Sequence, residues 1–422
     1  MRSASGKASA SGLRSPSVLS GVWARRQDNM TQPQIKTDRP SGLSDISDPD
    51  HFKMLTPGPL STALDVREEM LHERFPWDDE FQAIVEDVRQ RILKIAHADP
   101  AEYETILMQG SGTYGVESVL SSVPGPDDHV LVLVNGIYSE RMVEILTLQK
   151  TPVDRMDCPL TERHDPAKVA AYLDAHPEIT IVSMVHNETT TGILNDIATI
   201  GGIVKSRGRT FIVDCVSSFA AVDIDFPKIG IDFAITSSNK CVQGVPGFSV
   251  VIAKRSSLAV TKGHARSVSL DIYRQAQCFD ENPGVFRFTP PTHAVCAFWR
   301  ALIDFEAEGG QPARYARYFK NNRIVREGLE KLGFKPYLSL DVQGPILNTF
   351  HYPSEDFDFK RLREFMRKKG FVLFPGGVTP DPTIRLGNIG ELYEEDERRV
   401  VKAFEEYMAM IAEEREERKA AS

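Results

Sequence analysis

The chain has 422 residues, of which 41% are hydrophobic and 26% are charged, and its formal net charge is −9. This length allows two or three domains with a large buried core, and the composition is that of an ordinary globular protein. No apolar run is long enough to span a membrane, and the acidic balance argues against a general nucleic-acid-binding protein.

Residues 1–50 differ from the rest of the chain, because they are rich in Ser, Gly, Arg and Pro and poor in apolar residues. We therefore predict that this N-terminal extension is disordered. Basic residues and no acid precede Asp28, which is the composition of an organellar transit peptide. An untargeted tail, or translation from Met30, accounts for the same composition, so the sequence leaves a cytoplasmic and a mitochondrial location open.

Apolar runs alternate with helix-length segments over residues 51–310, for which we predict one large domain. The runs are residues 105–108, 129–135, 179–185, 210–214, 233–236 and 248–253. Such alternation predicts an α/β fold, with a mostly parallel sheet flanked by helices. The gap between the last two runs cannot hold a crossover helix, so one strand there should be antiparallel.

Residues 311–422 have a different pattern, which predicts a smaller C-terminal α+β domain. Strands are expected at 346–351, 372–375 and 383–386, and helices at 359–369 and 394–413. Two further helices, at 294–308 and 314–332, precede these strands.

Asp214 and Lys240 each follow an apolar run, at neighbouring strand ends. Ligands of open α/β sheets bind beyond the carboxyl ends of the strands. A lone loop lysine is usually only a surface residue, but a lysine and an acid so placed meet the needs of pyridoxal phosphate. The lysine forms a Schiff base, and the acid keeps the pyridine nitrogen protonated.

The glycine-rich segment QGSGTYG, residues 109–115, follows a predicted strand and opens a predicted helix. Its glycines allow a phosphate to approach the backbone, and the N–H groups at a helix start favour negative charge. We therefore expect Ser111, Gly112 and Thr113 to hold a cofactor phosphate. The same letters fit a nicotinamide-binding motif, but the next strand ends in Asn135 with no acid to hold a ribose.

A series of motifs resembles those of the class V pyridoxal-phosphate-dependent aminotransferases, and most closely those members that use 2-aminoethylphosphonate and pyruvate. The motifs are LTPGPL (55–60), WDDEF (77–81), LMQGSGTYGVESVL (107–120), NGIYSERM (135–142), MVHNETTTG (184–192), IVDCVSSF (212–219), SSNKCVQGVPGF (237–248), SLDIY (269–273), RFTPPTH (287–293) and RLGNIGE (385–391). They cover nearly all of residues 54–391 in the order that the family has them.

The resemblance implies an aspartate aminotransferase-like fold, pyridoxal 5′-phosphate as cofactor, and Lys240 and Asp214 as catalytic residues. The cofactor-binding residues would be Ser111, Gly112, Thr113, Tyr138, Thr190, Asp214, Ser237, Lys240 and Thr289. Tyr138 would stack on the ring, and a hydroxyl of the Thr190 cluster would reach the ring's phenolic oxygen. Arg385 matches the residue that binds the substrate carboxylate. Arg287, Arg266 and Lys262 are candidates for binding the phosphonate. We favour Arg287, because Thr289 must lie near a phosphate across the subunit interface.

The resemblance also implies a homodimer with active sites at the interface, and conversion of 2-aminoethylphosphonate and pyruvate to phosphonoacetaldehyde and L-alanine. We expect no metal, nucleic-acid or membrane partner. An alanine–glyoxylate or serine–pyruvate aminotransferase of the same fold is the nearest alternative. A cysteine desulfurase would need a cysteine in a long mobile loop, and none of the five cysteines lies in one. A non-catalytic protein on this scaffold is disfavoured by the intact Lys240 and Asp214.

Overall fold

The computed structural model describes residues 52–374 and 379–421. Its central element is a seven-stranded sheet. Its order is β2 (Tyr103–Gln109), β10 (Phe248–Lys254), β9 (Phe233–Ser237), β8 (Thr210–Asp214), β5 (Ile181–Val185), β3 (Val130–Val134) and β4 (Val153–Asp157). The strands from β9 to β4 are mutually parallel, whereas β10 is antiparallel to both of its neighbours. The predicted mostly parallel sheet and its antiparallel strand are therefore confirmed.

The strands β3, β5 and β9 are mostly apolar because both faces of the sheet are covered, and every residue in them is buried. Strand β4 has the polar sequence VDRMD and lies at the edge of the sheet, where its residues are half-buried or exposed. This polarity explains why the hydrophobic pattern did not predict β4.

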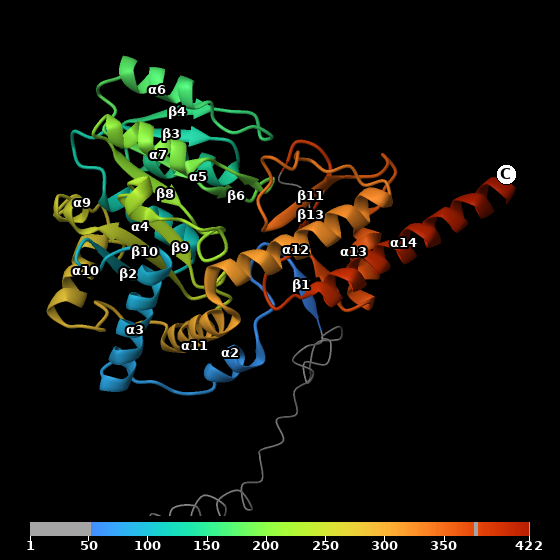
Figure 1. Cartoon of the computed structure of the whole chain (residues 1–422), viewed down its shortest axis with the longest axis horizontal. Coiled ribbons are helices and arrows are strands. Elements are labelled where there is room, and N and C mark those ends of the chain that lie inside the picture. The colour runs from blue at the N-terminus through green and yellow to red at the C-terminus, as the bar shows by residue number, and fades with distance from the viewer. Residues whose placement is uncertain (1–51, 375–378, 422) are drawn as a thin grey trace, which may run out of the picture. The chain divides into compact units, whose positions relative to one another are not determined.

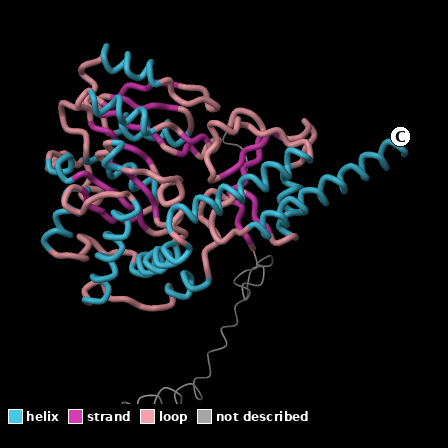
Figure 2. The backbone as a smooth tube through the Cα atoms, in the orientation of Figure 1, coloured by secondary structure: helices cyan, strands magenta, loops and turns pink. Residues whose placement is uncertain are grey.

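Helices enclose the sheet, as Figure 2 shows. They are α2 (Leu64–Glu69), α3 (Asp79–Ile95), α4 (Gly112–Ser122), α5 (Ile137–Leu148), α6 (Pro166–Ala175), α7 (Ile197–Ser206), α8 (Phe226–Ile229), α9 (Arg255–Ala259), α10 (Ile272–Glu281) and α11 (Thr292–Glu308). A two-stranded ribbon, β6 (Asn187–Glu188) with β7 (Ile193–Leu194), follows β5. None of the helices among the described residues is long and apolar enough to cross a membrane.

The C-terminal elements build a second apolar core. They are α12 (Gly310–Lys331), β11 (Leu347–His351), α13 (Phe359–Lys368), β12 (Phe371–Leu373), β13 (Thr383–Gly387) and α14 (Glu394–Ala421). Strand β11 pairs antiparallel with β13, and β12 pairs parallel with β1 (Lys53–Leu55). The first described strand thus lies among the last elements of the chain (Figure 1), which local sequence patterns do not reveal.

The predicted elements of this region are present within a few residues, although α14 continues beyond the expected end at 413. Division of the folded part at residue 310 stays a prediction. The N-terminal extension, with its predicted disorder and targeting role, lies outside the described residues.

Candidate active site

A cavity of about 240 Å³ lies beyond the carboxyl ends of β8 and β9. It is lined by Ser111, Gly112, Thr113, Val116, Tyr138, Arg141, Asp214, Val216, Ser237, Asn239 and Lys240. Seven of these were predicted from the sequence, and they come from segments far apart in the chain. Parallel pairing sets the Cα of Asp214 beside that of Ile235, so the loop after β9 passes close to the aspartate.

Lys240 follows the end of β9, and its Nζ donates a hydrogen bond of 2.6 Å to the carbonyl oxygen of Pro57. Gly58 is tightly constrained here, because a Cβ on it would lie 2.6 Å from Nζ and its φ is +123°. Burial lowers the pKa of the Lys240 ammonium to about 8. A fraction of an amine with this pKa is uncharged near neutral pH, as a nucleophile or base requires.

Asp214 ends β8, and its Oδ1 accepts a hydrogen bond of 2.8 Å from the backbone N–H of Val216. Burial, with a smaller contribution from the neighbouring Glu188 carboxylate, raises the pKa of the Asp214 carboxyl to about 7. A buried carboxyl of this kind gains much from a cation placed beside it, such as a protonated ring nitrogen.

The first turn of α4 offers open donors beside these two groups. The N-cap residue Ser111 makes no side-chain cap bond, so the N–H groups at this helix start remain available. The Oγ of Ser237 is buried without a hydrogen-bond partner among the described residues. A Cβ on Gly112 would lie 3.0 Å from the Val216 side chain, so a larger residue would crowd the cavity. Open donors, an amine and a buried acid together fit pyridoxal phosphate.

Thr190 lies behind the cavity wall and does not line it. Its Oγ1 donates to Glu188 Oε1 at 2.6 Å and accepts from the N–H of Ile137 at 2.8 Å. Glu188 also accepts from the Ser139 N–H at 3.1 Å, so this buried carboxylate fixes the start of α5, the helix that carries Tyr138. The predicted contact of Thr190 with a cofactor stays a prediction.

Arg385 lies on β13 and is buried. It does not line the cavity, but it interacts with Lys240 and Tyr138, which do. Its Nη1 donates to the carbonyl oxygen of Thr189 at 2.8 Å, and its guanidinium lies 4.6 Å from the ring centre of Phe374. Its Nε is buried with no hydrogen-bond partner among the described residues. An unsatisfied buried guanidinium donor is costly, and a carboxylate ligand would satisfy it.

Arg287 and Thr289 lie outside the cavity of the single chain. Arg287 donates from Nη1 to the carbonyl oxygen of Val268 at 3.1 Å. Thr289 is exposed, and its carbonyl oxygen accepts a hydrogen bond from the side chain of Gln109. Their predicted contacts with cofactor or substrate stay predictions.

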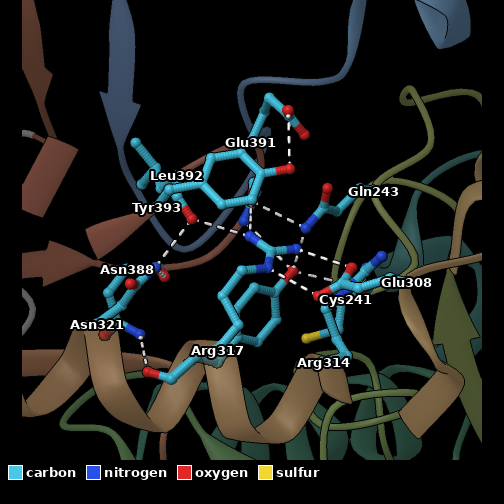
Figure 3. Close-up of polar contacts among 12 residues, drawn as sticks. Cys241, Gln243, Glu308, Arg314, Arg317, Asn321, Asn388, Glu391, Leu392 and Tyr393 are labelled. Atoms are coloured by element: carbon cyan, nitrogen blue, oxygen red, sulfur yellow. Dashed lines mark hydrogen bonds and ion pairs between the residues drawn. The ribbon is translucent and has the colours of Figure 1, made fainter. Parts of the chain in front are cut away.

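A polar network lies behind the loop that follows Lys240. Arg314 and Arg317 extend from α12 to Glu308, with hydrogen bonds of 2.7 and 2.8 Å (Figure 3). Arg314 also donates to the carbonyl oxygen of Cys241, and Arg317 donates to that of Gly390 at 2.8 Å. A cavity of about 340 Å³ lies against this network, but its arginines are already paired. The network therefore joins the lysine loop to the segment after β13.

Replacing Glu308 with glutamine should lower the free energy of unfolding, because two arginines would lose their shared carboxylate. Loss of charged hydrogen bonds to a largely buried partner costs roughly 2–4 kcal/mol. Urea unfolding measures the change, and Glu306→Gln is the matched control, since Glu306 is exposed and pairs with Arg91. Equal stability of the two variants would mean that the network contributes little.

Comparisons with known proteins agree with this geometry. The family model for aminotransferase class-V matches residues 71–377. The 2-aminoethylphosphonate–pyruvate transaminase of Lysinibacillus sphaericus is 45% identical over 360 residues, which are 85% of this chain and 98% of that protein. The enzyme of the same name from Phocaeicola vulgatus is 44% identical, over 83% of this chain and 98% of its own length.

Solved structures show the same fold. Pyridoxamine–pyruvate aminotransferase from Mesorhizobium loti matches with a TM-score of 0.78 at 26% identity, covering 87% of this chain and 94% of that one. An alanine–glyoxylate aminotransferase from Nostoc matches with a TM-score of 0.78 at 22% identity, over 86% of this chain and 97% of its own.

The region that the family model matches includes β8, β9 and the start of α4, and the hydrogen-bond donors there suit the family's cofactor. The chain therefore belongs to the class V aminotransferases, and it is a pyridoxal-phosphate-dependent transaminase.

Proposed function

We propose that this protein transfers the amino group of 2-aminoethylphosphonate to pyruvate, giving phosphonoacetaldehyde and L-alanine. The observation that carries the proposal is 45% identity over 98% of the length of a transaminase named for these substrates. The alanine–glyoxylate alternative has only a fold-level likeness at 22% identity. It is not the better supported reading.

Pyridoxal phosphate, when bound, supplies a carbonyl that takes up the amino group and a ring that accepts electron density from the reacting carbon. We assign Lys240 to covalent attachment of the cofactor and, once its amine is released, to moving the proton at the reacting carbon. Its lowered pKa supports this assignment, because about half of the released amine is unprotonated near pH 8. Asp214 would keep the proton on the ring nitrogen. Both roles agree with the placement of the two groups in one cavity.

The remaining assignments concern binding. Ser111, Gly112, Thr113 and Ser237 would hold the phosphate, and Tyr138 would pack on the ring. Thr190 would act from behind the cavity wall, through the phenolic oxygen of the ring. These assignments are supported by open donors at the start of α4 and by the unpartnered Oγ of Ser237.

We further propose a homodimer with its active sites at the subunit interface. In the single chain Thr289 is exposed and Arg287 is half-buried, and neither reaches the cavity. Thr289 would contact the phosphate in the partner subunit, and Arg287 would contribute positive charge there. Sedimentation equilibrium tests the dimer, and a monomer with full activity would contradict it.

Arg385→Lys should impair the half-reaction with pyruvate and leave that with 2-aminoethylphosphonate little changed, because only pyruvate carries a carboxylate. A lysine cannot reproduce the bidentate contact of a guanidinium, and losing it costs about 1.5–3 kcal/mol, or roughly 10- to 100-fold in affinity. Rapid-mixing spectra of each half-reaction measure the effect. Equal damage to both halves would show that Arg385 does not serve the carboxylate alone.

Product analysis tests the proposed reaction directly. With 2-aminoethylphosphonate and pyruvate together, phosphonoacetaldehyde and alanine should form in equal amounts. Faster turnover of alanine with glyoxylate, or of serine with pyruvate, would instead support the alternative aminotransferases.

A further inference from the structure

Arg141 lines the catalytic cavity and was not predicted from the sequence. It lies on α5, three residues after Tyr138, so both side chains extend from one face of the helix. Its guanidinium carbon lies 5.1 Å from the ring centre of Tyr138, and Nη1 donates to Thr113 Oγ1 at 3.2 Å. Arg141 therefore joins the aromatic wall of the cavity to the start of α4.

Arg141 forms no ion pair with a carboxylate among residues 52–374 and 379–421, although its charge acts on the Asp214 carboxyl of the same cavity. Other arginines of the chain differ, such as Arg207, whose Nε lies 2.7 Å from Asp174 Oδ1. The bond to Thr113 uses only one of the five N–H donors of a guanidinium. An unpaired arginine fork that is half-buried in a cavity is suited to an anion with several oxygens.

A second source of positive potential meets the guanidinium at the same place. Thr113 belongs to the first turn of α4, where the backbone N–H groups are open and the helix dipole is positive. Neutral or cationic ligands would gain nothing from this combination. A tetrahedral anion with two charges would engage both the helix start and the arginine.

We propose that Arg141 is an anion-binding residue of the active site that takes a phosphorus dianion. The inference rests on the proposed function, which brings two such groups into one cavity, the phosphate ester of the cofactor and the phosphonate of the substrate. Both have the same tetrahedral oxygens, and they differ in the molecule that carries them. Arg141 thus complements Arg385, whose open Nε suits a planar carboxylate.

Two binding measurements on Arg141→Gln separate the two sources. The first compares dissociation constants of cofactor-free protein for pyridoxal phosphate and for pyridoxal, by fluorescence quenching. The second compares spectral titrations of the loaded protein with 2-aminoethylphosphonate and with alanine. Loss of a charged bidentate contact should weaken the affected ligand by about 10- to 100-fold.

If the cofactor phosphate is the ligand, the substitution should lower the affinity for pyridoxal phosphate but not that for pyridoxal. If the substrate phosphonate is the ligand, the substitution should lower the affinity for 2-aminoethylphosphonate but not that for alanine. In either case Arg141→Lys should recover part of the loss, and Arg207→Gln should behave as the wild type. The proposal is overturned if the affinity for neither phosphorus compound falls. It is also overturned if the affinities for pyridoxal and alanine fall as much as those for the phosphorus compounds. A wild-type protein that ignores 2-aminoethylphosphonate would refute the proposed function, and the cofactor comparison alone would then decide the role of Arg141.

Discussion

Replacement of Lys240 by alanine should abolish transamination and remove the visible absorbance that a lysine-bound cofactor gives. The Nζ of Lys240 is the one amine among the residues that line the cavity, so no described group there can take over its covalent and proton-transfer roles. General acid–base catalysis alone contributes about 10²–10⁴-fold, so the rate should fall by at least that factor. Absorbance spectra and single-turnover rates measure both effects.

The variant should remain folded, because the Lys240 amine makes one hydrogen bond, to Pro57. Circular dichroism and the melting temperature test this. Lys228→Ala is the matched control, since Lys228 is an exposed lysine on the short helix α8. A folded Lys240→Ala protein that still exchanges amino groups would contradict the cofactor assignment.

Asp214→Asn should still bind the cofactor but lose most of its turnover. An amide can accept a hydrogen bond, but it cannot balance the positive charge that keeps the ring nitrogen protonated, so the electron sink is lost. We expect a decrease in kcat on the order of 10³-fold, within the range of a lost charge interaction in a buried site. Near-normal turnover would mean that another acid performs this task.

Although Asp214→Asn should impair turnover, it should increase the stability of the cofactor-free protein. Burial raises the pKa of Asp214 to about 7, against roughly 4 for an unfolded aspartate. The folded carboxyl holds its proton more tightly, so it destabilises the fold increasingly as the pH rises from about 4 through 7. Cofactor-free Asp214→Asn should therefore be the more stable protein at about pH 8, and the difference should shrink toward pH 5. Equal stability at the higher pH would contradict the raised pKa.

The sequence predicted the parts of the site that follow strand ends. Asp214 and Lys240 come after apolar runs that form β8 and β9, and the glycine-rich segment follows β2. Parallel strands bring such ends to one edge of the sheet, so these residues lie together for a topological reason. Motif resemblance added Tyr138 and Ser237, which also line the cavity.

Residues that act through tertiary contacts were not predictable in this way. Arg141 reaches the cavity because of the direction in which α5 lies, and nothing in its local pattern separates it from a surface arginine. Glu188 lies in a polar cluster, and only the fold shows that it binds Ser139. The pairing of β1 with β12 joins segments that lie hundreds of residues apart. The hydrogen bond from Arg314 to Cys241 joins residues that lie tens of residues apart. Periodicity reports on neighbours in the chain, not on such contacts.

Half-reaction spectroscopy tests the central claim most directly. Purified, cofactor-loaded protein is mixed with 2-aminoethylphosphonate in the absence of pyruvate. We predict loss of the visible absorbance with release of one phosphonoacetaldehyde per active site, and its return on addition of pyruvate, with one alanine formed. A spectrum that 2-aminoethylphosphonate leaves unchanged, while alanine or serine bleaches it, would contradict the proposed donor.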